Sequence, residues 1–99
     1  MVIERKMEND TIILELNGEI TALTAEQFSV AIKTAIEETA RLVLDFKEVG
    51  YIASAGLRVL LEVKKLLDAK AGKLIARNVS QSVMHVFEIT GFNEIIDLE

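Results

Sequence analysis

Residues 42–57 read LVLDFKEVGYIASAGL, and this stretch decides the fold because an apolar run leads into the start of a helix. The run Leu42–Phe46 is short and nearly continuous, as is typical of a central strand that is covered on both faces. Beyond the following loop, apolar residues recur at the spacing of an amphipathic helix. A strand that passes directly into a long helix predicts an α/β fold with parallel strands.

The helix after this loop is predicted to run from about residue 55 to residue 71. Gly72 follows it, and glycine suits the left-handed position that commonly ends a helix. Helical spacing places six residues on the stripe that faces the core, namely Gly56, Val59, Leu60, Val63, Leu66 and Leu67. These residues are expected to pack the helix against the sheet.

The N-terminal part of the chain predicts a hairpin followed by a helix. Residues 11–16 alternate as a strand does, with Ile12, Leu14 and Leu16 on one face. Residues 2–7 can pair with this strand through the turn-prone residues 8–10. A helix is predicted to begin after Thr24, which would form a capping box with Gln27. The core face of that helix is expected to consist of Phe28, Ile32, Ala35 and Ile36.

The C-terminal part continues the alternation of strands and helices. Residues 73–76 are strand-like, and Ser80 is predicted to cap a helix that ends at Gly91. The inward residues of this helix are expected to be Val83, Val86 and Phe87. Residues 94–98 are predicted to form a final short strand. The chain is therefore expected to be one α/β domain over residues 1–99, with a mostly parallel, mixed sheet of about five strands and about three to four helices.

Length, charge and composition restrict the class of protein. The 99 residues suit one domain, and the net charge of −5 argues against partners such as nucleic acid or anionic membrane. The chain has no cysteine, so it offers neither disulfides nor a thiolate metal site, and a cytoplasmic location is the default expectation. Residues 1–6 lack a signal-peptide core, and no apolar run is long enough for membrane insertion. A protein partner or a small ligand is expected.

Ser54 is the residue that most needs an explanation, and two interpretations are open. A serine before an amphipathic helix can cap it by accepting a hydrogen bond from an early backbone N–H group, so that its replacement by alanine costs about 1 kcal/mol. Alternatively, a phosphoryl group on Ser54 would lie in the favourable field of the helix N-terminus and would change the local charge to roughly −2. The second interpretation makes Ser54 a candidate switch.

The helical azimuth predicts what surrounds Ser54. Ser54 is expected above Arg58, Leu61 and Lys65, away from the stripe that faces the sheet, and is therefore expected to be accessible. Leu57 and Leu61 are predicted on the outer or flanking side of the helix, which would make a docking surface. The alternative is that Leu57 is edge core and that the cations belong to an ordinary solvated face. Arg58 is also placed to pair with a phosphate on Ser54.

The same residues argue against an enzyme. A serine nucleophile needs a base, but His85 is the only histidine and is predicted on the exposed or flanking side of a different helix. The stretch Ile52–Gly56 has glycine at only one of the two positions of a nucleophile elbow. No phosphate-binding loop or cluster of metal ligands is present around Asp45, which is expected to end a strand or, less simply, to orient the Ser54 loop. No cofactor is expected.

Four segments of the chain resemble the STAS domain family, best known from bacterial anti-sigma factor antagonists. The resemblance covers nearly the whole chain and is strongest in its order of motifs rather than in any single one. The segments are Leu16–Ile20 (LNGEI), Leu44–Ile52 (LDFKEVGYI), Ser54–Leu57 (SAGL) and Val86–Phe92 (VFEITGF). The resemblance implies a STAS-like fold over residues 1–99.

The resemblance also implies a function. In such proteins the hydroxyl residue at the position of Ser54 is phosphorylated by an anti-sigma factor that is itself a serine kinase. The unphosphorylated antagonist binds this kinase and releases the sigma factor, and a phosphatase resets the cycle. The family usually has an acidic residue and a second hydroxyl beside the phosphorylated residue and an aspartate at the position of Thr21. This chain has Ala53, Ala55 and Thr21 there.

The implied partner-binding surface comprises Thr21, Ala53, Ser54, Ala55, Gly56, Leu57, Arg58 and Leu61. Two other interpretations are non-enzymatic, because STAS-like domains also act as accessory subunits of lipid-transport ATPases and as adaptors in sensory assemblies. An antagonist should lose its partner when Ser54 is charged, whereas an accessory subunit should copurify with an ATPase and be less sensitive to that charge. The residues leave open whether the free domain is a monomer or a weak homodimer.

Overall fold

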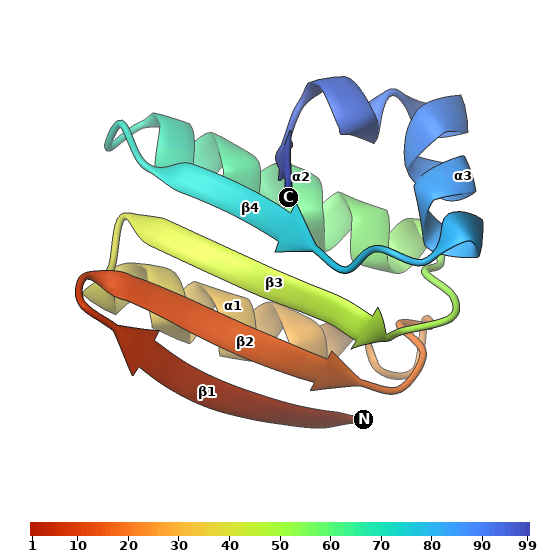
Figure 1. The fold of residues 1–99 in the computed structure, drawn as a ribbon, viewed down its shortest axis with the longest axis horizontal. Helices are drawn as coiled ribbons and strands as arrows, with labels where there is room; N and C mark the ends of the chain where they lie inside the picture. The colour runs from red at the N-terminus through yellow and green to blue at the C-terminus, as the bar shows by residue number, and fades with distance from the viewer.

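The computed structural model describes residues 1–99 as alternating strands and helices (Figure 1). The predicted order of elements is confirmed, with one additional 3-10 turn. The elements are β1 (Val2–Glu8), β2 (Thr11–Asn17), α1 (Ala25–Glu38), β3 (Arg41–Glu48), α2 (Ser54–Asp68), β4 (Lys73–Arg77), α3 (Gln81–Thr90), the 3-10 turn η1 (Phe92–Glu94) and β5 (Asp97–Leu98).

The five strands form one sheet in the order β1-β2-β3-β4-β5. β1 pairs antiparallel with β2, and every later neighbour pair is parallel. The predicted hairpin is present, and its turn contains Asn9 in a left-handed conformation with φ 56°. The prediction of a mostly parallel, mixed α/β sheet of about five strands with about three to four helices is confirmed, with five strands and three α-helices.

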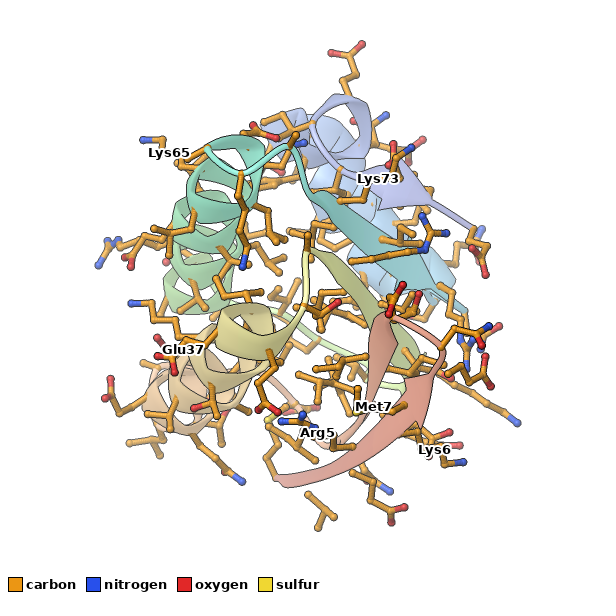
Figure 2. All side chains as sticks on the ribbon, turned by 90° about the vertical axis from the view of Figure 1, so that its left-hand side faces the viewer. Arg5, Lys6, Met7, Glu37, Lys65 and Lys73 are labelled. Atoms are coloured by element: carbon orange, nitrogen blue, oxygen red, sulfur yellow. The ribbon has the colours of Figure 1, made fainter.

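The helices pack on one face of the sheet. In Figure 1, α1 and α2 lie behind the strands, and Figure 2 shows both of them on the same side of the sheet. The main core contains 24 buried residues from this layer, and Phe87 of α3 joins it by an edge-on contact with Phe46 at 5.9 Å between ring centroids. The other face of the sheet has a small cluster of Ile13, Val43 and Ile75. All of Leu42–Phe46 is buried and β3 is the central strand, as expected, although the large core lies on the helix face alone.

The start of α1 differs from the prediction. Phe28, Ile32, Ala35 and Ile36 are buried as expected. However, Thr24 and Gln27 form no capping box. The Thr24 hydroxyl donates to the Glu19 carbonyl at 2.8 Å, and the Gln27 amide donates to the Met1 carbonyl at 2.7 Å. Both side chains bind backbone that lies outside the helix, Thr24 in the loop between β2 and α1 and Gln27 at the residue before β1.

The end of α2 also differs from the prediction. The helix ends at Asp68, and Ala71 rather than Gly72 takes the left-handed conformation, with φ 55°. Gly72 is required for a different reason, because a Cβ atom there would collide with the Ala40 carbonyl. Five of the six predicted stripe residues are buried, but Leu66 is 49% exposed. Leu66 instead lines a surface pocket between α1 and α2, together with Ile36 and Glu37.

The C-terminal predictions are largely confirmed. Ser80 accepts a hydrogen bond from the Val83 N–H group, and Gly91 ends α3 in a left-handed conformation with φ 81°. Val83 and Phe87 are buried, whereas Val86 is only partly buried. The strand predicted over residues 94–98 is shortened to Asp97–Leu98, because η1 extends to Glu94 and a turn follows it. None of the helices has both the length and the apolar character needed to cross a membrane.

Candidate functional site

The loop before α2 meets the loop before α1 at the carboxyl ends of the parallel strands. Ile20 and Ile52 form an isolated parallel bridge between these loops. The Ile20 N–H group donates to the Tyr51 carbonyl at 3.0 Å, and the Ala53 N–H group donates to the Ile20 carbonyl at 2.8 Å. These two bonds hold the residue before Ser54 in a defined position. Thr21 follows Ile20 directly and therefore belongs to the same cluster of loops.

The start of α3 holds the other side of the loop before α2. The Ser80 hydroxyl donates to the Val49 carbonyl at 3.3 Å, and the Ser82 hydroxyl donates to the Gly50 carbonyl at 3.0 Å. Ser80 also caps α3, so the same side chain fixes the helix start and the neighbouring loop. The loop that ends at Ser54 is thus bound on two sides by segments distant in the sequence.

Ser54 is the first residue of α2 and is exposed, as predicted. Of the two open interpretations of Ser54, the helix cap is wrong, because Ala53 occupies the cap position and Ser54 already has helical geometry. The Ala53 carbonyl accepts from the Gly56 and Leu57 N–H groups at 2.9 Å and 3.1 Å. The Ser54 hydroxyl has no hydrogen bond within the protein. It is therefore free for a modification or for a partner.

Gly56 brings the start of α2 close to the bridged loops. A Cβ atom at this position would lie 2.5 Å from the Ile20 side chain and 2.9 Å from the Ile52 side chain. Only glycine permits so close an approach without a shift of these buried isoleucines. Gly56 thereby determines how deeply the first turn of α2, and with it Ser54, lies against the loop.

The predicted surroundings of Ser54 are partly confirmed. Arg58 and Lys65 are exposed and Leu61 is 36% exposed, so these three lie on the outer side of α2. Leu57 is only 9% exposed and belongs to the main core, which corrects its placement on the outer side and supports the edge-core alternative. Ala53 and Ala55 are half-buried beside the serine.

Asp45 supports the site from a distance. It lies inside β3, which continues to Glu48, so the expectation that it ends the strand is wrong. Its carboxylate accepts from the Lys47 N–H group at 3.0 Å, from the Asn78 amide at 3.1 Å and from the Arg77 guanidinium at 3.3 Å. Burial raises the pKa of Asp45, but these bonds outweigh burial, so the pKa lies below its usual value. Asp45 therefore anchors the segment that leads to Ser80.

The arrangement lacks the parts of a nucleophilic site. Ser54 has no hydrogen-bonded base, and His85 lies exposed on α3, as predicted. No group of three or more histidine, aspartate or glutamate side chains is close enough to hold a metal ion. The geometry instead presents a free hydroxyl on a rigidly held helix start, beside cations and exposed apolar side chains.

The family model of the STAS domain matches residues 3–99 of the chain. The chain belongs to the STAS domain family. The match includes every strand and helix described above except the first residue of β1, so the resemblance noted from four short segments extends to nearly the whole domain.

Relatives of this STAS domain carry regulatory names. The anti-sigma-B factor antagonist of Bacillus subtilis is 32% identical over 94 residues, which are 95% of this chain and 85% of the relative. The anti-sigma-B factor antagonist of Listeria monocytogenes is 31% identical over 96 residues, 96% of this chain and 84% of the relative.

A solved structure of the anti-sigma factor antagonist SpoIIAA in its unphosphorylated form is also similar. It has a TM-score of 0.77 and 25% identity, and the match covers 99% of this chain and 87% of that chain. The phosphorylated form of the Bacillus cell fate determinant SpoIIAA matches with a TM-score of 0.76 and the same 25% identity, over 99% of this chain and 91% of that chain. The fold of this STAS domain is therefore the SpoIIAA fold.

Two apolar residues near Ser54 were missed by the sequence reasoning. Leu23 is 94% exposed in the loop before α1, and Tyr51 is 49% exposed in the loop before α2. Tyr51 accepts the backbone bond from Ile20, so the two loops that carry these residues are adjacent. Leu23 is an apolar residue in a loop that belongs to neither the strand pattern nor the helix pattern. That position was the only feature of the sequence that indicated its exposure.

Proposed function

We propose that this STAS domain is an anti-sigma factor antagonist that binds an anti-sigma factor with serine kinase activity and releases it when Ser54 is phosphorylated. The names of the relatives and the similarity to SpoIIAA in both phosphorylation states support the proposal. The regulated step takes place in the cytoplasm, and a phosphatase returns Ser54 to its free form. The domain itself acts by binding and not by catalysis.

The observation that carries the proposal is the state of the Ser54 hydroxyl. It is exposed, forms no bond within the protein and stands at the first position of α2. A phosphoryl group there gains the favourable field of the helix N-terminus and lies one turn from the Arg58 guanidinium. The domain thus tolerates the modification, while an interface packed against Ser54 receives a charge of about −2.

The proposed interface extends from the helix start over the neighbouring loops. Its residues are those implied by the family resemblance, Thr21, Ala53, Ser54, Ala55, Gly56, Leu57, Arg58 and Leu61. Gly56 and Leu57 act from below the surface, because both are buried and hold the first turn of α2 in place. Leu23 and Tyr51 add exposed apolar area on the two bridged loops. A partner that covers this surface must desolvate Ser54. A charge on Ser54 would therefore decide whether the partner binds.

Binding of Ser54 variants to the anti-sigma factor that copurifies with the protein tests the proposal. Ser54→Asp places a charge in the desolvated interface and is expected to weaken binding at least about tenfold by titration calorimetry. Ser54→Ala is expected to bind as the unchanged protein does. Thr34→Asp, which adds the same charge at an exposed position of α1, serves as the control and is expected to have no effect.

Equal affinities for Ser54→Asp and Ser54→Ala would contradict the switch. Mass spectrometry of the protein from its native host, with and without phosphatase treatment, provides an independent test. We expect a single phosphate on the peptide that contains Ser54. Copurification with a transport ATPase, without any phosphate on Ser54 under growth or stress conditions, would instead indicate an accessory subunit.

A further inference from the structure

The β1 strand leaves a long edge of the sheet unpaired. β1 has seven residues and only β2 as a neighbour, whereas the opposite edge strand, β5, has two residues. The backbone N–H and C=O groups on the outer side of β1 can therefore bind another extended strand. Because β5 is so short, pairing of one copy's β1 with another copy's β5 would form few bonds.

The side chains of β1 divide between two faces of the sheet. The register with β2 places Ile3, Arg5 and Met7 on the face that α1 covers, because their partners Leu16, Leu14 and Ile12 belong to the main core. The opposite face of β1 carries Val2, Glu4, Lys6 and Glu8. Figure 2 shows Arg5 on the side of β1 near α1 and Lys6 on the other side.

The face of β1 away from α1, here called its outer face, carries charges that are incompletely paired within one chain. Lys6 forms an ion pair with Glu15 at 3.1 Å. Glu4 lies directly opposite Glu15 in the register and forms no ion pair of its own. Like charges that face each other across strands are unfavourable, so Glu4 would gain from a cation on its free side.

We propose that two copies of the chain associate through antiparallel pairing of their β1 strands about a two-fold axis at Arg5. This symmetry places Glu4 of one copy opposite Lys6 of the second copy, and Lys6 opposite the second copy's Glu4. The strand is thus complementary to itself in charge. In each dimer, both Glu4 residues, which are unpaired in the single chain, thus face a lysine of the other copy. The two five-stranded sheets join into one continuous sheet of ten strands.

Charge also selects the register of this pairing. If the helices of both copies are to lie on the same face of the joined sheet, the two-fold axis must pass through a residue of β1. The possible registers therefore differ only in which residue that is. An axis at Glu4 would place Glu4 opposite itself. An axis at Lys6 would place Lys6 opposite itself and Glu4 opposite Glu8. An axis at Met7 would place Lys6 opposite Glu8 but would pair only residues 6–8 of β1. Among the registers that pair at least five residues of β1, only the axis at Arg5 brings opposite charges together on the outer face, so the pairing closes in one defined arrangement.

The face near α1 is compatible with the same register. Ile3 would lie opposite Met7 of the second copy, and Met7 is 59% exposed in the single chain. Beside them a groove of about 530 Å³, with Val30 among its lining residues, separates β1 from α1. The two Arg5 residues face each other, but each guanidinium is already bound to Glu38 by two bonds of 2.7 Å. Their positive charges are therefore neutralised within each copy.

The association is expected to be weak and to leave the Ser54 surface free. One strand pair buries far less area than the roughly 1,200 Å² of a small stable interface, and each copy carries a net charge of −5. β2 separates β1 from β3, the strand that leads to the Ser54 loop. Each dimer would thus present two copies of that surface. The inference does not depend on the proposed function.

Sedimentation equilibrium of the whole chain between about 10 μM and 1 mM at physiological salt tests the pairing. We expect a reversible dimer. Glu4→Lys and Lys6→Glu each turn both attractive contacts of the dimer into repulsions, and each is expected to weaken dimerisation roughly tenfold. Glu37→Lys and Lys65→Glu make the same charge changes at exposed positions of α1 and α2 and are expected to leave the dimer unchanged.

Mixing the variants separates strand pairing from general charge attraction. An equimolar mixture of Glu4→Lys and Lys6→Glu restores opposite charges across the axis and is expected to form a heterodimer at least as strong as the original dimer. The mixture of Glu37→Lys and Lys65→Glu has the same net charges and should gain nothing. A chain that stays monomeric at 1 mM, or a mixture that fails to restore association while both variants keep the original melting temperature, would overturn the proposal.

Discussion

At the scale of single residues, two serines with similar sequence contexts have different structural roles. Ser54 and Ser80 each precede a predicted amphipathic helix, and a cap was predicted for Ser80 and was one of two open interpretations for Ser54. Ser80 has an extended backbone, and its side chain accepts a hydrogen bond from the Val83 N–H group. Ser54 already has a helical backbone, and Ala53 occupies the cap position of α2. The difference arises because the bond from Ala53 to the Ile20 carbonyl places the helix start one residue earlier than the local pattern indicates.

This difference predicts unequal effects of two alanine substitutions on stability. Ser54→Ala removes no hydrogen bond, so the free energy of unfolding should change by less than about 0.5 kcal/mol. Ser80→Ala removes a helix cap and a bond to the neighbouring loop, and should lower it by about 1–2 kcal/mol. Urea denaturation measures both values. A loss of about 1 kcal/mol for Ser54→Ala would restore the capping role that the structure denies.

At the scale of secondary-structure elements, glycine positions determine how the helices meet the loops. Gly56 lies against Ile20 and Ile52, and Gly72 lies against the Ala40 carbonyl. In each case a helix end contacts a segment that is distant in the sequence. The sequence pattern identified Gly72 as a helix terminator and Gly56 as a core position. Neither contact was predictable, because each depends on how separate elements pack together.

Replacement of Gly56 by alanine tests this packing. The added methyl group would lie 2.5 Å from the Ile20 side chain, so the chain must shift, at a cost that outweighs the better helix propensity of alanine. The free energy of unfolding should fall by about 1–2 kcal/mol. Gly50→Ala is a matched control, since no atom lies within 4 Å of the added carbon. Equal stability of the two variants in urea would refute the close contact.

At the scale of the whole molecule, one buried carboxylate links the central strand to the C-terminal part of the chain. Asp45 binds both Arg77 and Asn78, and the segment after them carries the serines that hold the Ser54 loop. The helices on one face of the sheet play no part in this link. The opposite face of β3 therefore has a structural role, although the buried apolar side chains on that face of the sheet are only Ile13, Val43 and Ile75.

The lowered pKa of Asp45 predicts how stability depends on pH. Since the carboxylate ionises more readily in the folded chain, its contribution is complete above the unfolded pKa, near 3.8, and is lost as the pH falls through the lower folded pKa. Asp45→Asn should therefore reduce the free energy of unfolding by about 1–3 kcal/mol at neutral pH.

The loss caused by Asp45→Asn should shrink as the pH falls below 3.8. Urea denaturation at a series of pH values measures this dependence. Asp68→Asn removes an exposed carboxylate that pairs with Lys64 and is the control, with an expected change of less than about 1 kcal/mol. A loss for Asp45→Asn that stays constant with pH would contradict the assignment.

The sequence alone determined the order of the elements, the inward faces of most of them and the exposed position of Ser54, because hydrophobic spacing is a local property of the chain. The tertiary structure decided which residue begins α2, that the helices share one face of the sheet, and that Leu57 is buried while Leu23 and Tyr51 are exposed. These outcomes depend on contacts between distant segments, such as the bond from Ile20 to Tyr51. No local sequence pattern encodes such contacts, since the burial of a residue depends on whether a segment distant in the sequence packs against it.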